Sequence, residues 1–425
     1  MLRVFHEREK KQLHFTLDIP IPEEVTQHPE LETFLRSFSQ NGGTVKTGPA
    51  GDIESLTIGI DDWGRLIRDN LSGQKAEFQL SILTQLLDSD AMELGNGLQV
   101  NFHQNPFDTP QRYWNFIFNQ GHFTLYFFNR VNWYMAPKNQ IVTPFPLHVD
   151  IETASTCNMD CPMCYRRGLK HTGQMAPELF RKAVDECARE GVFSIRLSWR
   201  GETLTHPRIK ELIQYACERI PNVSFLTNAF YISQEMAECF VDAGLSYLAV
   251  SFDGIGEIYE KVRHPAKFKE NWDRLALLKN TKIRKGVMRP QVRLCTIWPA
   301  IKNAPEAYYD TMSPVSDYIV CNPYINFMGP MKLKPDFICQ YPWERLVIAY
   351  DGSTQCCTGW NAADVVIGNI KETSLKEMWT GQAMERIRTL HATGERLSLN
   401  SCAECRHGSK GDENVSIDEI LERRW

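Results

Sequence analysis

The sequence predicts an α/β protein that is divided into three parts. Residues 147–327 repeat a strand pattern followed by a helix pattern, and this order favours parallel strands joined by right-handed crossovers. Residues 1–140 mix helix and strand patterns and are predicted to form an N-terminal α+β domain. Residues 335–410 form a short segment with spaced cysteines, and residues 411–425 are left as a C-terminal tail. A chain of 425 residues is long enough for this organisation.

The N-terminal region contains one clear helix pattern and two aromatic runs. A helix is predicted to begin at Pro29 and to end at Gly42-Gly43, because the apolar residues between them share one face. The aromatic runs 113–118 and 122–128 are separated by an Asn-Gln-Gly turn signal, which predicts a β-hairpin. Aromatic side chains in such runs are more typical of a packed core than of a substrate groove.

The middle region supplies six strands and the helices between them. The candidate strands are 147–152, 194–199, 223–227, 246–252, 291–297 and 317–321. The segments with helical periodicity are 177–189, 207–219, 233–243 and 268–279. In parallel barrels the chemistry gathers at the carboxyl ends of the strands, so the loops after these strands are the first place to look for a site.

Three closely spaced cysteines follow the first strand directly. Cys157, Cys161 and Cys164 lie in the stretch C-N-M-D-C-P-M-C-Y, which contains no histidine. A [4Fe–4S] cluster normally takes four thiolates, so three cysteines would leave one iron open to another ligand. The alternatives are a zinc site or three buried thiols, although zinc sites usually pair such cysteines with a second, distant pair or with histidines.

This C-x3-C-x2-C spacing resembles the signature of radical S-adenosylmethionine enzymes, and the resemblance extends over residues 147–410. It implies a partial (β/α)6 TIM-like barrel followed by a small C-terminal cluster-binding domain. It also implies that S-adenosylmethionine chelates the open iron through its methionyl amine and carboxylate. The implied reaction is hydrogen abstraction from an unactivated C–H bond by a 5′-deoxyadenosyl radical.

The resemblance also nominates residues that bind the cofactor. The segment S-W-R-G-E-T-L-T-H-P resembles the family's G-G-E-P motif, with Arg200 and Thr203 in place of the first glycine and the proline. Its glutamate accepts a hydrogen bond from the methionyl ammonium, although the segment is also compatible with an ordinary strand-to-helix turn. The segment V-S-F-D-G, followed by Y-x3-R, is similar to a cofactor-contacting strand end of the family, although Asp253-Gly254 is equally compatible with an ordinary turn. The segment T-N-A is similar to the family's T-N-G, and an aromatic residue near the cysteine loop packs near adenine in the family. The cofactor-binding candidates are Glu202, Ser251, Tyr165 and Asn228.

A second set of cysteines lies near the C-terminus, and its predicted ligands are Cys339, Cys357, Cys402 and Cys405. Their spacing, C-x12-G-x4-C, then 44 residues, then C-x2-C, resembles the auxiliary-cluster domains called Twitch and SPASM and implies one auxiliary [4Fe–4S] cluster. A structural zinc site is the alternative. A hairpin is predicted around Gly352, and because side chains alternate along a strand, only one of Cys356 and Cys357 should face the cluster.

The remaining candidates are weaker. Cys187, Cys217 and Cys239 lie within helical patterns and are predicted to be core thiols. Cys295, Cys321 and Cys356 lie near predicted strand ends and are minor candidates for a hydrogen donor. Position on the predicted strands directs Arg293, Asn322 and Tyr324 toward the barrel mouth as substrate-contacting candidates. No catalytic base is identified by the sequence.

Composition limits the partners and the compartment. The net charge of −5 and the lack of a basic run argue against nucleic acid and anionic membranes. No apolar stretch approaches the roughly 18 residues of a spanning helix, and the start M-L-R-V-F-H-E-R-E-K-K is too charged for a secretory signal. A cytoplasmic protein is expected, with its 13 cysteines reduced or bound to metal.

The sequence therefore predicts a radical S-adenosylmethionine oxidoreductase, dependent on a reducing partner such as flavodoxin or ferredoxin. The first expectation is oxidation of a sugar or other small molecule, with electron transfer to the auxiliary cluster. The alternatives are a peptide maturase in which residues 1–140 recognise a precursor, a cyclase of the molybdenum-cofactor type, and a non-enzymatic iron–sulfur protein.

Overall fold

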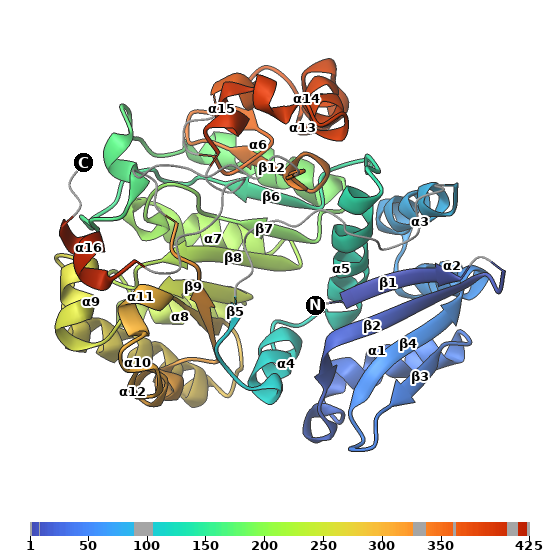
Figure 1. The fold of residues 1–425 in the computed structure, drawn as a ribbon, viewed down its shortest axis with the longest axis horizontal. Helices are drawn as coiled ribbons and strands as arrows, with labels where there is room; N and C mark the ends of the chain where they lie inside the picture. The colour runs from blue at the N-terminus through green and yellow to red at the C-terminus, as the bar shows by residue number, and fades with distance from the viewer. Residues whose placement is uncertain are drawn as a thin grey trace.

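A ten-stranded sheet forms the centre of the molecule in the computed structural model (Figure 1). The structure describes residues 2–7, 9–88, 105–325, 337–359, 363–405 and 415–422. The strand order is β14-β13-β12-β6-β7-β8-β9-β10-β11-β5, so that β14 and β5 end the sheet. An open sheet of this kind fits the predicted partial barrel.

Six parallel strands build the barrel part of this sheet, and all of them lie at the predicted positions. They are β6 (His148–Ile151), β7 (Ser194–Arg196), β8 (Asn222–Thr227), β9 (Tyr247–Ser251), β10 (Gln291–Ile297) and β11 (Tyr318–Asn322). The helices that follow them are α6 (Pro177–Arg189), α7 (Ile209–Cys217), α8 (Gln234–Asp242), α9 (Gly256–Val262), α10 (Phe268–Lys285), α11 (Trp298–Ile301) and α12 (Pro305–Met312). The α/β prediction is confirmed.

The two faces of the barrel sheet differ in chemistry because side chains alternate along each strand. On β6, Val149 and Ile151 belong to the large hydrophobic core that the surrounding helices cover. The alternate residues His148 and Asp150 are polar, buried and directed to the other face. The barrel interior is therefore polar, and it is this face that carries the sites described below.

The N-terminal region has its own antiparallel sheet, of order β1-β2-β4-β3. Its strands are β1 (Leu2–Glu7), β2 (Gln12–Ile21), β3 (Thr44–Thr47) and β4 (Ile53–Gly59), and its helices are α1 (Pro29–Gln40), α2 (Ile60–Asn70) and α3 (Gly73–Asp88). Helix α1 lies where the sequence predicts it. Its first turn is capped by His28, whose Nδ1 accepts a hydrogen bond from the Glu30 N–H.

The predicted aromatic hairpin is wrong, because both runs are helical. They form α4 (Pro110–Phe118) and α5 (Phe123–Lys138). Thr109 caps α4 by accepting a hydrogen bond from the Arg112 N–H at 3.2 Å, and Pro110 occupies the first helical turn, where its missing N–H costs nothing. The aromatic side chains of both helices are largely buried, as expected of a core.

Helices α4 and α5 connect the N-terminal region to the barrel (Figure 1). One hydrophobic core contains side chains of β1–β4 and of α4 and α5 together with Leu147, Ala249, Cys295, Tyr318 and Val320. The short strand β5 (Asn105–Pro106) also pairs with β11. The described residues of the N-terminal region therefore share their core with the barrel sheet.

The C-terminal region extends the same sheet. Strand β12 (Arg345–Ile348) pairs in parallel with β6, and β13 (Ser353–Gln355) and β14 (Val366–Asn369) follow antiparallel. The turn between β12 and β13 contains Gly352 with a φ of +90°, which a residue without Cβ adopts readily. The remaining helices are α13 (Leu375–Thr380), α14 (Gln382–Ala392), α15 (Asn400–Ala403) and α16 (Ile417–Glu422).

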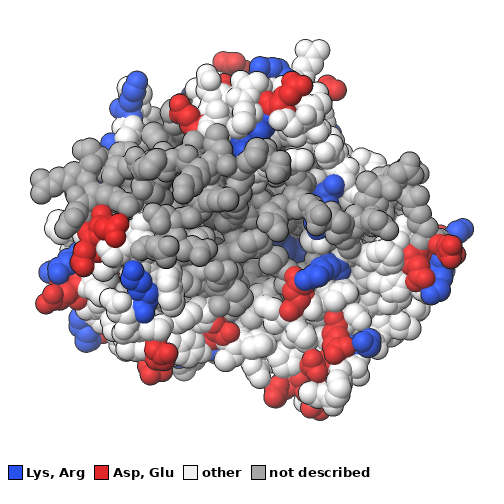
Figure 2. Space-filling model, viewed as in Figure 1, with Lys and Arg blue, Asp and Glu red and all other residues white. Residues whose placement is uncertain are grey.

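Acidic and basic side chains are interspersed on the face seen in Figure 2. This agrees with a net charge of only −5 in a chain of 425 residues. None of the described helices has the length and apolar character of a membrane span.

Candidate functional site

The cysteine loop and all four predicted cofactor-binding residues line one cavity of about 160 Å³. The cavity lies where β6, β7, β8 and β9 end, as expected for a parallel barrel. Its walls include Cys157, Cys161, Cys164, Tyr165, Glu202, Asn228 and Ser251. The structure thus brings together residues from Cys157 to Arg263, which are far apart in the sequence.

Several N–H groups point at the sulfur atoms of the loop. The Met159 N–H donates to Cys157 Sγ at 3.4 Å, and the Asn228 side-chain amide lies 3.9 Å from the same sulfur. Arg263 Nη1 lies 3.7 Å from Cys161 Sγ. Burial raises the pKa of Cys161 to about 11, and the nearby guanidinium opposes this shift. Soft thiol ligands with N–H donors around them fit an iron–sulfur cluster, whose positive irons deprotonate the thiols.

Glu202 is fixed at the wall of this cavity by three hydrogen bonds. Its carboxylate accepts from Thr227 Oγ1 at 2.8 Å, from the Asn228 N–H at 2.8 Å and from the Leu204 N–H at 3.2 Å. Burial raises the pKa of the Glu202 carboxyl to about 7, although these donors pull it down. Gly201 precedes it where a Cβ would lie 2.5 Å from backbone atoms of Ala154 and Thr156, so this glycine is required for close approach of two loops.

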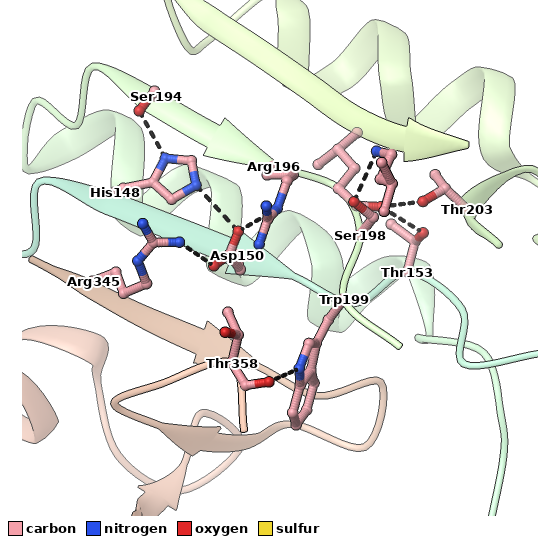
Figure 3. Close-up of polar contacts among 12 residues, drawn as sticks. His148, Asp150, Thr153, Ser194, Arg196, Ser198, Trp199, Thr203, Arg345 and Thr358 are labelled. Carbon is pink, nitrogen blue, oxygen red and sulfur yellow. Dashed lines mark hydrogen bonds and ion pairs between the residues drawn. The ribbon is translucent and has the colours of Figure 1, made fainter. Parts of the chain in front are cut away.

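Arg200, which stands where the family motif has glycine, makes a buried ion pair. Its Nε and Nη2 donate to the Glu152 carboxylate at 2.8 and 2.6 Å, and Glu152 also accepts from the Tyr350 N–H at 3.2 Å. The guanidinium lies 3.9 Å from the Trp199 ring centroid. The Trp199 indole N–H donates to the Thr358 carbonyl at 2.9 Å (Figure 3). The substituted position therefore links the cavity to the C-terminal region.

A second buried ion pair, which sequence reasoning missed, lies at the end of β9. Arg263 Nε donates to Asp253 Oδ2 at 2.7 Å, and Asp253 Oδ1 accepts from the Ile297 N–H at 2.9 Å. Because Arg263 also approaches Cys161, Asp253 holds the arginine against the cysteine loop. The signal was present in the sequence as D-G followed by Y-x3-R, but a plain turn explained Asp253 equally well.

The second set of cysteines is also gathered in space. The pKa of the Cys339 thiol is raised well above its ordinary value by burial and by its neighbours Cys405, Cys357 and Cys402. The Gly359 N–H donates to Cys357 Sγ at 3.4 Å, and His391 Nε2 lies 3.5 Å from Cys402 Sγ. Among the described residues, no group of three or more His, Cys, Asp or Glu side chains has the spacing that a single metal ion requires.

Cys356 and Cys357 are close to one another, and both interact with the rest of the set. A hydrogen bond with Cys357 and, after it, burial raise the pKa of Cys356 well above its ordinary value, and the nearby Cys402 and Cys339 raise it further. Cys356 is 2 % exposed and belongs to the main hydrophobic core. The choice of Cys357 as the ligand stays a prediction.

The weaker candidates lie away from the cavity. Arg293, predicted at the barrel mouth, is only the third residue of β10 and lies near the opposite end of the strand, against Tyr247. Tyr324 is 5 % exposed in the main core, and Cys295 lies in the core shared with α4 and α5. Neither Arg293, Asn322 nor Tyr324 contributes to the described walls of the cofactor cavity.

Comparison with known families agrees with this geometry. Residues 151–290 match the radical SAM superfamily, and residues 339–406 match SPASM, an iron–sulfur cluster-binding domain. The chain carries a radical SAM domain and a SPASM domain. Domains of these two kinds imply [4Fe–4S] clusters and S-adenosylmethionine as cofactors.

Three curated proteins show the extent of the similarity. The antilisterial bacteriocin subtilosin biosynthesis protein AlbA of Bacillus subtilis is 31% identical over 96 residues, which are 22% of this chain and 21% of the relative. Fe-coproporphyrin III synthase of Methanosarcina barkeri is 33% identical over 109 residues, 25% of this chain and 27% of the relative. PqqA peptide cyclase of Rhodopseudomonas palustris is 30% identical over 111 residues, 26% and 29% respectively. The chain thus spans between about a fifth and a third of these relatives' length.

A solved structure shows a weak overall likeness. The crystal structure of BtrN in complex with AdoMet and 2-DOIA covers 66% of this chain and 97% of its own, with a TM-score of 0.43 and 18% identity.

Proposed function

We propose that this protein is a radical SAM maturase that modifies a ribosomally made peptide. Two of the similar proteins are a bacteriocin biosynthesis protein and a peptide cyclase, which support a peptide substrate better than the sugar or other small molecule expected first. Fe-coproporphyrin III synthase, whose name indicates no peptide substrate, is similar over a comparable length, 109 residues. The observation that supports the radical chemistry is the single cavity that unites the cysteine loop with Glu202, Asn228 and Ser251.

Within this proposal, Cys157, Cys161 and Cys164 hold a [4Fe–4S] cluster. A [4Fe–4S] cluster held there would supply, with S-adenosylmethionine, the radical chemistry that removes a hydrogen atom from the substrate. Glu202 accepts a hydrogen bond from the methionyl ammonium, because its carboxylate is held at the cavity wall by three donors. A cation beside a buried carboxylate favours its ionised form.

Two further residues complete the binding surface in this proposal. Asn228 fixes the loop by donating to the Asn158 side-chain oxygen at 2.9 Å. Ser251 ends β9 at the cavity wall and offers a hydroxyl to the ribose or carboxylate of the cofactor. Tyr165 begins a 3-10 turn (Tyr165–Gly168) directly after the cysteine loop and offers an aromatic face for adenine.

The second cysteine set holds one auxiliary cluster in this proposal, with Cys339, Cys357, Cys402 and Cys405 as ligands. Trp199 supports a functional connection between the two regions, since it lies at the cofactor cavity and donates a hydrogen bond to the residue that follows Cys357. Electrons would enter from a reducing partner such as ferredoxin or flavodoxin.

The proposal is tested with the full-length protein, reconstituted with iron and sulfide under anaerobic conditions. It is incubated with S-adenosylmethionine, dithionite and either peptides encoded beside its gene or a panel of sugars and aminocyclitols. Mass spectrometry should detect 5′-deoxyadenosine together with a changed mass of one peptide. The variant with Cys157, Cys161 and Cys164 replaced by alanine is the control and should form neither product. Turnover with a sugar or aminocyclitol alone would replace the peptide proposal by small-molecule oxidation.

A further inference from the structure

A second cavity, of about 330 Å³, lies at the opposite end of the barrel strands. The first residues of β6, β7, β8 and β9 contribute to its wall, and these are His148, Ser194, Asn222 and Tyr247. Helices α4 and α5 close it from the other side. No described residue lines both this chamber and the cofactor cavity. From His148 to Glu152, β6 and the residue after it advance about 13 Å, so a ligand in the chamber leaves the cofactor cavity free.

The chamber contains more positive than negative charge. Four arginines line it: Arg130, Arg196, Arg293 and Arg345. Asp150 pairs with Arg196 Nε at 2.7 Å and with Arg345 Nη1 at 3.2 Å (Figure 3). Glu344 accepts a hydrogen bond from Arg345 Nε at 2.8 Å. Two carboxylates thus face four guanidinium groups among the described residues.

His148 does not change this balance. Burial lowers the pKa of its imidazole to about 4, although Asp150 opposes the shift. The ring is held between Ser194 Oγ at 2.7 Å from Nδ1 and Asp150 Oδ1 at 3.1 Å from Nε2 (Figure 3). Near neutral pH the imidazole is therefore uncharged, and the excess in the chamber is two positive charges.

The two arginines without a carboxylate partner supply this excess. Within the described part of the chain, neither Arg130 nor Arg293 has an acidic oxygen within ion-pair distance, and the Nε of each is buried without a hydrogen-bond partner. Their guanidinium groups lie beside aromatic rings instead, 4.2 Å from Trp133 and 5.3 Å from Tyr247. Arg130 Nη2 donates to Asn129 Oδ1 at 2.8 Å and Arg293 interacts with the Cys295 side chain, so the unused buried donors are the two Nε atoms. A partly buried cation with an unused buried donor is costly unless an anion joins it.

We infer that this chamber binds a small organic anion, namely a carboxylate attached to an aromatic or apolar group. The planar guanidinium fork matches a carboxylate through two parallel hydrogen bonds. The aromatic walls, formed by Phe116, Tyr126, Trp133, Phe193 and Tyr341, suit an apolar body. A cavity of about 330 Å³ is within the range of small-molecule sites, which begin at about 300 Å³. The carboxylate belongs either to a free organic acid or to the C-terminus of a peptide.

The test measures binding by isothermal titration calorimetry on the reconstituted full-length protein. Phenylacetate should bind to one site per chain, whereas phenylacetamide, its uncharged analogue, should not. Arg293→Met should weaken phenylacetate binding by about tenfold or more, since the charge-assisted hydrogen bonds of this guanidinium are lost. The matched control is Arg219→Met, which removes an arginine 3.5 Å from the Tyr215 ring outside the chamber and should leave the affinity unchanged.

Three results would overturn the inference: equal binding of phenylacetamide, an unchanged affinity in Arg293→Met, or inorganic phosphate binding as tightly as phenylacetate. If Arg293→Met loses the circular dichroism spectrum of the folded protein, Arg130→Met takes its place with the same expected loss. The tripeptide Gly-Gly-Phe, with a free or an amidated C-terminus, separates the two sources. Displacement of phenylacetate by the free form alone assigns the site to a peptide terminus, and no displacement by either form assigns it to a free acid. These measurements need no turnover, so their failure is distinct from failure of the proposed function.

Discussion

Breaking the ion pair between Arg200 and Glu152 should destabilise the protein far more than breaking an exposed pair. Glu152 has a fully buried side chain, and that of Arg200 is 14% exposed. Glu152→Ala leaves a buried guanidinium and the Tyr350 N–H without an acceptor, while Arg200→Ala leaves a buried carboxylate. Each single substitution is expected to lower the free energy of unfolding by about 3–5 kcal/mol. The double variant leaves no unpaired charge and should cost about the same as either single one.

The assay is urea unfolding of the cofactor-free chain, followed by circular dichroism. The double-mutant cycle should therefore yield a coupling energy of about 3 kcal/mol or more between the two residues. The control cycle uses the exposed pair Lys261 and Glu257, whose atoms lie 3.7 Å apart and whose coupling should be about 0–1 kcal/mol. Additive effects of Glu152→Ala and Arg200→Ala, or effects no larger than those of the exposed pair, would refute this reasoning.

Three further predictions concern the cofactor cavity. Gly201→Ala should reduce S-adenosylmethionine binding, measured by calorimetry, because the new Cβ would meet backbone atoms at 2.5 Å; wild-type affinity would contradict the close approach. Since burial raises the pKa of Glu202 to about 7, the cofactor-free protein should lose stability as pH rises from about 4.5 to about 7, and Glu202→Gln should flatten this dependence of urea unfolding on pH. After anaerobic reconstitution, the variant with Cys157, Cys161 and Cys164 replaced by alanine should contain about four irons per chain in an iron assay, all held by the second set of cysteines. An iron content of zero would show that the second set binds no iron–sulfur cluster.

The barrel was predictable because its signals are local. Each strand has a run of apolar residues, and each helix has apolar residues at helical spacing, so both patterns are visible within one segment. The prediction for the two aromatic runs was wrong because aromatic residues favour strands in general. The cap at Thr109 and the proline after it are a local signal for a helix in the first run. The second run, α5, begins after His122 without a side-chain cap and offers no such signal.

The sequence predicted residues that line the cofactor cavity, but it did not predict the hydrogen-bond partners that hold the neighbouring side chains in place. Motif spacing identified the cysteines and Glu202, whereas the partners of Arg200 and Trp199 lie 48 and 159 residues away. Such pairs leave no periodic signal in one sequence. The strand that contains Arg293 was predicted correctly, but Arg293 was expected near the carboxyl end of that strand. In the structure it is the third residue of β10 and lies near the opposite end.

The attachment of the C-terminal region to the barrel follows from one short polar pattern. In H-V-D-I-E, the acidic residues Asp150 and Glu152 lie on the same inner face because they are two positions apart. Strand β6 lies between β7 and β12, so each carboxylate reaches a partner on both sides. Asp150 joins Arg196 to Arg345, and Glu152 joins Arg200 to the Tyr350 backbone. Since two buried acids tie both neighbouring segments to β6, loss of either acid should loosen the C-terminal cysteines as well as the barrel.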